Sequence, residues 1–272
     1  MLYKSTRTRK NFINIKNAKM RFSKWSGLGN DFVIVESDAG VDAVRWCDRR
    51  KGIGADGVVI VTPLGGSDFR MRIINSDGSE AAMCGNASRC VAKYIRSHGL
   101  GTGEKFALHT LSGIVRTEVH PDGTVTVDMG PARPFLGSIT LEADGHAFAA
   151  ETVSMGNPHA VIFVDDIAAV PLENWGPILE HDKQFPDRCN IEFAEMLSPD
   201  RIRMRVWERG CGVTAACGTG SCATLVAAQK CRNAAVKAEI VLDGGSLFIE
   251  REREGHVFMT GSADEIFQGE IQ

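Results

Sequence analysis

The stretch FRMRIINSDGSEAAMCGNASR at residues 69–89 decides the fold, because it recurs as IRMRVWERGCGVTAACGTGSC at residues 202–222. Seven of the 21 aligned positions are identical, at a constant spacing of 133 residues. Each copy begins with alternating apolar and polar residues, the pattern of a half-buried strand, and reaches a Cys-Gly pair nine residues after that strand ends. The two copies predict two related units in one chain, arranged about a pseudo-twofold axis.

A second pair of motifs supports the duplication. Gly29-Asn30 precedes an apolar run at 32–35, and Gly156-Asn157 precedes another at 160–164. Apolar residues at helical spacing follow each Cys-Gly pair, which predicts a helix in both units. Many short strands with few helices predict the α+β class.

The chain is expected to divide into three parts. Residues 1–19 carry six basic side chains, no acid and no apolar periodicity, and are expected to lie outside the fold. They fit an upstream translation start or an artificial addition, with an organelle-targeting peptide as the alternative. Residues 20–130 and 131–272 form the two units, and the last strand is expected to return to the first. The stretch 129–134 is rich in Gly and Pro, which predicts a turn between the units.

Composition and charge exclude several classes of protein. The net charge of −3 combines the basic extension with a body at 20–272 that holds 25 basic and 34 acidic residues, a poor match for nucleic acid. The longest apolar run has five residues, far short of the roughly 20 that a membrane helix needs. The eight cysteines form no C-x-x-C motif, so we expect no metal site. Without a visible secretory signal, we expect free thiols and a cytoplasmic location.

Two of these thiols occupy positions that suggest proton transfer. Cys84 and Cys217 each lie where a predicted helix begins, so free backbone amides and the helix dipole are expected to lower their pKa. The same amides would bind a carboxylate. A pseudo-twofold axis would place one thiol on each side of an α-carbon, where one removes a proton and the other delivers one. We expect five of the remaining six cysteines to be structural: Cys47, Cys90, Cys189, Cys222 and Cys231. The sixth, Cys211, precedes a glycine in a predicted loop and has no counterpart in the repeat.

The motifs resemble the diaminopimelate epimerase family of cofactor-independent isomerases. The resemblance runs from about residue 20 to the C-terminus. It includes GLGNDF at 27–32, MCGN at 83–86, MGNPH at 155–159, NIEF at 190–193, WERG at 207–210 and ACGTG at 216–220. It implies two domains, each with a mixed, mostly antiparallel sheet wrapped around a central helix, and an active site in the cleft between them. This chain has Ala87 where the family has Gly, and Gly57 where some members have Gln.

The resemblance also implies roles for individual residues. Cys84 and Cys217 would be the acid and base, and His159 and Glu208 would adjust their proton affinity. The residues implied at the reacting end are Asn30, Gly85, Asn86, Asn157, Gly218 and Thr219. Asn75, Asn190, Glu208 and Arg209 would bind the distal amino and carboxylate groups, for which an arginine and several acceptors are suited. The implied substrate is diaminopimelate, in lysine and peptidoglycan precursor synthesis, handled by a homodimer without cofactor.

Two other functions stay open from the residues. One is a related racemase of another amino acid, such as histidine or proline. The other is a redox-active dithiol protein, which would form a Cys84–Cys217 disulfide and exchange no α-proton. A binding module without catalysis would need the loss of one thiol, and both are present.

Overall fold

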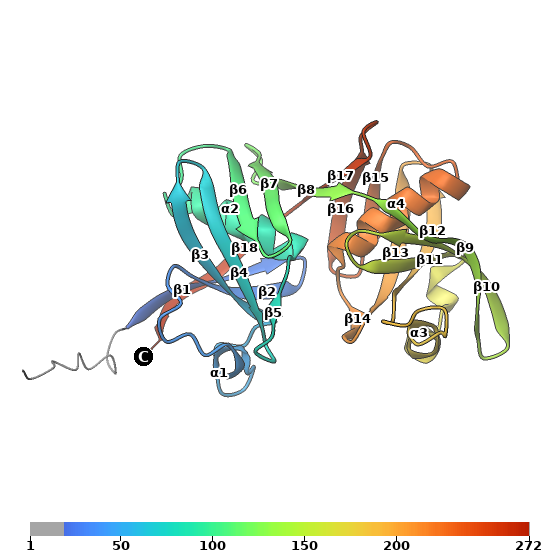
Figure 1. Ribbon diagram of the computed structural model, residues 1–272, viewed down its shortest axis with the longest axis horizontal. Coiled ribbons are helices and arrows are strands. Elements are labelled where there is room, and N and C mark those ends of the chain that lie inside the picture. The colour runs from blue at the N-terminus through green and yellow to red at the C-terminus, as the bar shows by residue number, and fades with distance from the viewer. Residues whose placement is uncertain (1–18, 272) are drawn as a thin grey trace, which may run out of the picture.

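The structure is a computed structural model that describes residues 19–271. The extension predicted at 1–19 lies outside the described residues except for Lys19, whose Nζ is 3.2 Å from the carboxylate of Glu270. Figure 1 shows two lobes side by side, each a curved sheet with one long helix against it. The predicted α+β class is confirmed.

The first half of the chain contains eight strands and two helices. They are β1 (Met20–Gly27), β2 (Asn30–Val35), α1 (Ala43–Cys47), β3 (Gly57–Gly65), β4 (Asp68–Asn75), β5 (Glu80–Ala81), α2 (Gly85–Ser97), β6 (Lys105–Thr110), β7 (Gly113–Val119) and β8 (Val125–Pro131).

The second half repeats this order, with additions around α3. Its elements are β9 (Arg133–Ala143), β10 (His146–Ser154), β11 (Pro158–Phe163), the 3-10 helix η2 (Ile167–Ala169), α3 (Leu172–Glu180), β12 (Asn190–Ser198), β13 (Arg201–Glu208), β14 (Gly212–Thr214), α4 (Gly218–Cys231), β15 (Lys237–Leu242), β16 (Gly245–Arg251), β17 (His256–Gly261) and β18 (Asp264–Ile271).

Strand pairing confirms the duplication. The first lobe has the order β18-β1-β2-β3-β4-β6-β7-β8, and the second has β9-β10-β11-β12-β13-β15-β16-β17. In the first lobe the pairs β2–β3 and β4–β6 are parallel, and in the second lobe the pairs β11–β12 and β13–β15 are parallel. The other five pairs of each lobe are antiparallel. The two sheets therefore agree in strand order and in strand direction throughout.

The chain exchanges strands between the lobes. β9 follows the first half but pairs with β10, and β18 follows the second half but pairs with β1, as Figure 1 shows near the C-terminus. Between the lobes β8 pairs antiparallel with β17, with Val127 opposite Met259. The turn predicted at 129–134 is wrong: β8 and β9 are separated by Ala132 alone, so the chain passes from strand to strand there and serves the exchange, with Gly130 of β8 at a φ of +76°. The domain boundary predicted between residues 130 and 131 stays a prediction.

The two long helices are largely buried, although the last turn of α2 keeps Arg96 and Ser97 exposed. Ten of the 13 residues of α2 are buried, and nine of the 14 residues of α4. This burial fits the composition of α4, most of whose residues are small or apolar. Val91 of α2 and Leu225 of α4 are fully buried in one hydrophobic cluster that extends through both lobes. Smaller clusters lie beneath α1 and α3.

Both predicted Gly-Asn turns join equivalent strands. Gly29 lies between β1 and β2, and Gly156 lies between β10 and β11. Their φ angles are +88° and +96°, a region that glycine reaches without the strain a Cβ would cause. Each turn therefore presents the following asparagine, Asn30 or Asn157, at the start of its strand.

Candidate active site

Cys84 and Cys217 are the N-cap residues of α2 and α4. Their backbone angles are alike, with φ −147° and ψ 118° at Cys84 and φ −121° and ψ 112° at Cys217. These extended angles are typical of an N-cap, which leaves the first amides of each helix without a partner inside the helix. The predicted placement of both thiols at helix starts is confirmed.

Cys84 lies beside two predicted site residues, Asn30 and Asn86. The Cys84 thiol is 3.8 Å from Oδ1 of Asn30, and Nδ2 of Asn86 donates to the same oxygen at 3.3 Å. Asn30 is held by its own Nδ2, which donates to Asp56 at 2.7 Å. The amide oxygen of Asn30 is thereby directed at the thiol and at the first turn of α2.

The second lobe repeats this arrangement around Cys217. Nδ2 of Asn157 donates to the hydroxyl of Thr219 at 3.4 Å, the counterpart of the Asn30–Asn86 contact. The Cys217 sulfur accepts from the Gly220 amide at 3.4 Å and is 3.6 Å from the Thr219 hydroxyl. Each Gly-Asn turn therefore contacts the first turn of the helix in its own lobe.

His159 and Glu192 form a buried pair beside this second site. Nδ1 of His159 is 2.7 Å from Oε1 of Glu192, and Nε2 is 3.0 Å from Oδ1 of Asn157. Both side chains are fully buried, and the other carboxylate oxygen of Glu192 has no hydrogen-bond partner among the described residues. The pair fixes the imidazole and, through Asn157, supports Thr219.

Glu208 is the predicted residue that acts on both thiols. Burial raises the pKa of its carboxyl group, while hydrogen bonds from Thr214 and Cys217 lower it. Its negative charge raises the pKa of Cys84 and of Cys217. A carboxylate between two thiols makes the thiolate form costly at either one.

The pKa prediction for the thiols is therefore wrong in its net direction. Burial raises the pKa of Cys84, and the amides of Ala87 and Asn86 lower it by less. Burial, Glu208 and Glu192 together raise the pKa of Cys217 well above its ordinary value. The helix-start amides act in the expected sense, but desolvation and the two carboxylates outweigh them.

The predicted distal residues are brought together only in part. Oδ1 of Asn190 accepts from the backbone amide of Arg209 at 3.0 Å, and Glu208 is the adjacent residue. The exposed guanidinium of Arg209 donates to the carbonyl of Asp187 and, within residues 19–271, pairs with no carboxylate. Asn75 lies at the end of β4 in the first lobe, where its amide donates to Ser79 rather than to another predicted site residue of the described chain.

Direct contacts join the two helix starts across the lobes. Nδ2 of Asn86 lies 3.5 Å from the carbonyl oxygen of Ala216, the residue before Cys217. A Cβ at Gly85 would lie 2.8 Å from Met259, and one at Gly218 would lie 2.9 Å from the same residue. A side chain at either glycine would therefore have to displace the flexible end of Met259, and the two glycines leave that space to it.

Ala87 is compatible with the first helix start. It is fully buried within α2 and is not among the residues of positive φ. The glycine that the family has at this position is therefore not required for the backbone angle.

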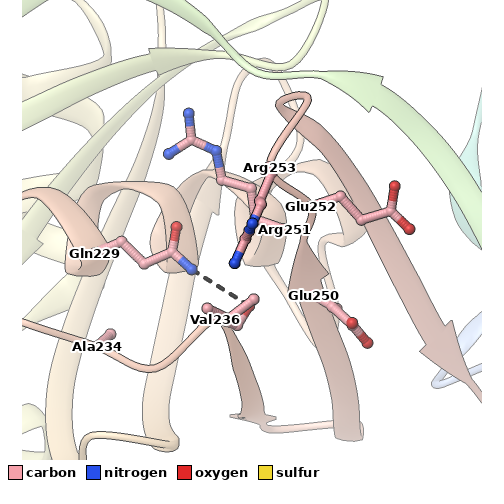
Figure 2. Close-up of a pocket in the computed structure, with 7 residues that line it drawn as sticks. All are labelled: Gln229, Ala234, Val236, Glu250, Arg251, Glu252 and Arg253. Carbon is pink, nitrogen blue, oxygen red and sulfur yellow. Dashed lines mark hydrogen bonds between the residues drawn. The ribbon is translucent and has the colours of Figure 1, made fainter.

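A cavity of about 610 Å³ lies elsewhere, near the end of α4. It is lined by Gln229, Val236 and the segment 250–253, with Gln229 directed at Val236 in Figure 2. No predicted site residue lines it. Across residues 19–271, no three His, Cys, Asp or Glu side chains gather as a metal site would need. In the same part of the chain, no helix is both long and apolar enough to cross a membrane.

The free thiols expected from the sequence are confirmed. All eight cysteines are free, although Cys231 is only half-buried.

Three residues that support the site were missed. Asp56, Arg89 and Glu192 support site residues, and the sequence analysis assigned none of them a role. Arg89 and Glu192 carried a signal, because each is a charged residue inside a run of otherwise buried positions.

Solved structures show the class of fold. A probable proline racemase from Agrobacterium radiobacter has a TM-score of 0.71 at 16% identity, covering 93% of each chain. A phenazine biosynthesis protein of the PhzF family from Bacillus anthracis has a TM-score of 0.69 at 17% identity, covering 94% of this chain and 100% of the other. The fold is thus one that racemases and epimerases share.

Sequence relatives are more specific. The family described as diaminopimelate epimerase matches residues 22–134 and 151–266. Diaminopimelate epimerase from Synechococcus elongatus is 45% identical, and that from Phocaeicola vulgatus is 46% identical, each over 93% of this chain and 98% of the relative. The chain belongs to the diaminopimelate epimerase family.

Proposed function

We propose that this protein is an isomerase that interconverts LL- and meso-2,6-diaminopimelate by proton transfer between Cys84 and Cys217. The observation that carries the proposal is the placement of the two thiols on equivalent helix N-caps of two lobes that Asn86 and Ala216 join. Relatives that carry the name diaminopimelate epimerase support the substrate. The role follows in lysine and peptidoglycan precursor synthesis.

The two helix starts suit the reacting end of an amino acid. Amides of Gly85 and Asn86 on one side, and of Gly218 and Thr219 on the other, would bind the α-carboxylate. Negative charge that develops on this carboxylate during deprotonation is stabilised by the same amides. Asn30 and Asn157, at the edges of the two helix starts, would fix its orientation.

The chemical step needs one thiolate and one thiol. The thiolate takes the α-proton, and the electron pair of the broken C–H bond moves toward the carboxylate. The thiol on the opposite face then gives its proton to the α-carbon, which inverts the centre and exchanges the roles of the two sulfurs. Because burial and Glu208 raise the pKa of both thiols, the α-ammonium of a bound substrate would assist ionisation by adding positive charge.

The distal end of the substrate would be bound by Arg209, Glu208 and Asn190 of the second lobe and by Asn75 of the first. Arg209 is exposed and, in the described chain, has no carboxylate partner, so it suits the distal carboxylate. Glu208 and the side-chain oxygens of Asn190 and Asn75 suit the distal ammonium. Asn190 holds the backbone of Arg209 and would set the reach of that guanidinium.

The test is proton NMR of LL-diaminopimelate with the purified protein in D₂O. We expect loss of the Cα–H signal of the reacting centre together with appearance of the meso isomer, before and after dialysis against a chelator. Histidine and proline serve as competing substrates. Activity that vanished on dialysis and returned only with a cofactor would contradict the thiol mechanism, and faster exchange of proline would favour the related racemase.

The redox function is separated by a different readout. It requires reversible formation of a Cys84–Cys217 disulfide as the productive step. For the epimerase we expect full activity in excess reductant and loss of activity on oxidation. A reaction that consumed reductant and left the α-proton in place would favour the dithiol protein.

We further propose that the protein works in the cytoplasm as a homodimer. Eight free thiols suit a reducing compartment. Among the described residues the edge strand β18 pairs only with β1, and it exposes Ile266 and Phe267, an edge that a second copy could cover. Sedimentation analysis of the wild type beside a variant with Ile266→Lys and Phe267→Lys tests this, with a monomeric variant expected.

A further inference from the structure

Arg89 is a fully buried cation that meets no carboxylate in the part of the chain that the structure describes. It lies in the second turn of α2 and is 0% exposed. Nη1 donates to Oδ1 of Asn86 at 2.9 Å and lies 3.4 Å from the sulfur of Met259, and Nε donates to the carbonyl of Ser262 at 3.0 Å. Nη2 has no hydrogen-bond partner among the described residues. Burial of a charge with one unpaired donor lowers the stability of the fold. A role at the site would explain why the chain carries this residue.

The duplication makes Arg89 conspicuous. Its counterpart at the 133-residue spacing is Cys222, also fully buried and close enough to interact with the guanidinium. The two lobes match in strands, helices and thiols, yet in residues 19–271 the first has a buried arginine at this helix position and the second has a cysteine. The residue therefore introduces an asymmetry that the pseudo-twofold fold lacks.

Arg89 also determines which way the amide of Asn86 faces. A guanidinium has donors only, so it must meet the oxygen of that amide. Nδ2 is then left to face Asn30 and the carbonyl of Ala216, where it lies at 3.3 and 3.5 Å. One buried cation thus orders both the amide beside Cys84 and the contact between the two helix starts.

We propose that Arg89 is a positioning residue of the epimerase, which favours the thiolate at Cys84 over that at Cys217 and holds the Asn86 amide toward the site. The inference rests on the proposed function for its meaning in catalysis, but its electrostatic part concerns Cys84 alone. The resting enzyme would then carry its base in the first lobe and its acid in the second.

The charges around the two thiols support this assignment. Burial raises the pKa of the Cys84 thiol and Glu208 from β13 raises it further, whereas Arg89 on its own helix lowers it by a smaller amount. Cys217 feels Glu208 and Glu192, and both raise its pKa. Arg89 itself is surrounded by Cys84 and Cys90 of α2 and by Cys222 of α4.

The experiment compares Arg89→Met and Arg89→Gln with Lys93→Met as the matched control. Lys93 lies one turn further along α2 and donates to Ala263 at 2.6 Å, so its replacement removes a charge from the same helix without touching Asn86. Alkylation of Cys84 by iodoacetamide is followed against pH by mass spectrometry of its peptide. Thermal unfolding and α-proton exchange are measured on the same samples.

Loss of the cation should raise the pH at which Cys84 reacts. The alkylation rate at pH 7 should fall several-fold in both Arg89 variants, with no change in Lys93→Met. We expect exchange activity to fall with it. The melting temperature should hold or rise in Arg89→Met, because an apolar side chain replaces a buried charge. Arg89→Gln can still donate to Asn86, so its KM should stay closer to that of the wild type.

Unchanged alkylation of Cys84 in both folded variants would overturn the proposal. So would unfolding of both, which would give Arg89 a purely structural role. Because alkylation needs no diaminopimelate, a shifted profile without any epimerase activity would contradict the proposed function and leave the electrostatic role of Arg89 standing.

Discussion

Cys84 and Cys217 hold the same position in two lobes, each as the N-cap of a buried helix with extended backbone angles. Their surroundings differ in charge. Arg89 acts on Cys84 beside the shared Glu208, whereas Cys217 is affected by both Glu208 and Glu192. An enzyme that inverts a centre needs this combination: two equivalent positions on opposite faces and two different protonation states.

Replacing either thiol with serine should abolish epimerisation but leave half of the chemistry. A hydroxyl is far less acidic than a thiol, so Cys84→Ser and Cys217→Ser should each lower turnover by orders of magnitude. Each variant keeps one base and should exchange the α-proton of one isomer only. Isomer-resolved deuterium exchange by NMR measures this. If either variant epimerised both isomers near the wild-type rate, the two-base mechanism would be wrong.

Substitution of Arg209 should weaken binding of the distal end. Within residues 19–271 its guanidinium donates to the carbonyl of Asp187, and its backbone amide donates to Asn190. Loss of a charged hydrogen bond is worth about 1.5–3 kcal/mol, so kcat/KM of Arg209→Ala should fall about 10- to 100-fold. Arg209→Lys should recover only part, because it cannot bind a carboxylate at two points. An amino acid without distal charged groups is the control, since its slow exchange should not change.

The repeat and the site thiols could be predicted from the sequence because both depend on local pattern. The strand alternation before Cys84 and Cys217, and the apolar helix after each, require no knowledge of the partner lobe. The extended path at 129–134 could not be predicted, since Gly and Pro indicate a turn locally whereas the pairing of β9 with β10 is decided by the other lobe. The raised thiol pKa values likewise depend on burial, and on the charges of Glu208 and, for Cys217, Glu192, all of which tertiary packing determines.

Stability should fall in alkaline solution because of the buried structural thiols. Burial raises the pKa of Cys47 to about 11 and that of Cys90 to about 12, from an ordinary value of 9.0. Above pH 9 the unfolded chain loses these protons while the folded protein keeps them. Each such thiol therefore lowers the free energy of unfolding by about 1.4 kcal/mol per pH unit, up to the pKa it has in the folded protein.

Urea unfolding between pH 8 and pH 11 measures this slope. Cys90→Ala should show a smaller loss of stability per pH unit than the wild type, even though it starts less stable. Val91→Ala, a neighbouring buried truncation on α2, should lose stability equally at all pH values. Equal slopes in the wild type and Cys90→Ala would show that Cys90 ionises in the folded state as readily as in the unfolded one.

Glu192→Gln should shift the alkaline limb of activity. Gly220 separates Glu192 from Cys217 so narrowly that a Cβ there would lie 2.7 Å from the carboxylate and 3.2 Å from the sulfur. The negative charge of Glu192 raises the pKa of Cys217, and glutamine removes that charge while still offering His159 an acceptor. The pKa of Cys217 should therefore fall, and the thiol that must donate a proton should be lost at lower pH. The alkaline limb of kcat/KM reports that thiol in the free enzyme, so we expect it to move to lower pH.

Alkylation of Cys217 should speed up at pH 7 in parallel. Glu195→Gln, on the same strand but bound to the amide of Ile167, should leave both profiles in place. If the alkaline limb of kcat/KM did not move in Glu192→Gln and the alkylation of Cys217 were no faster, the proton donor would be another group.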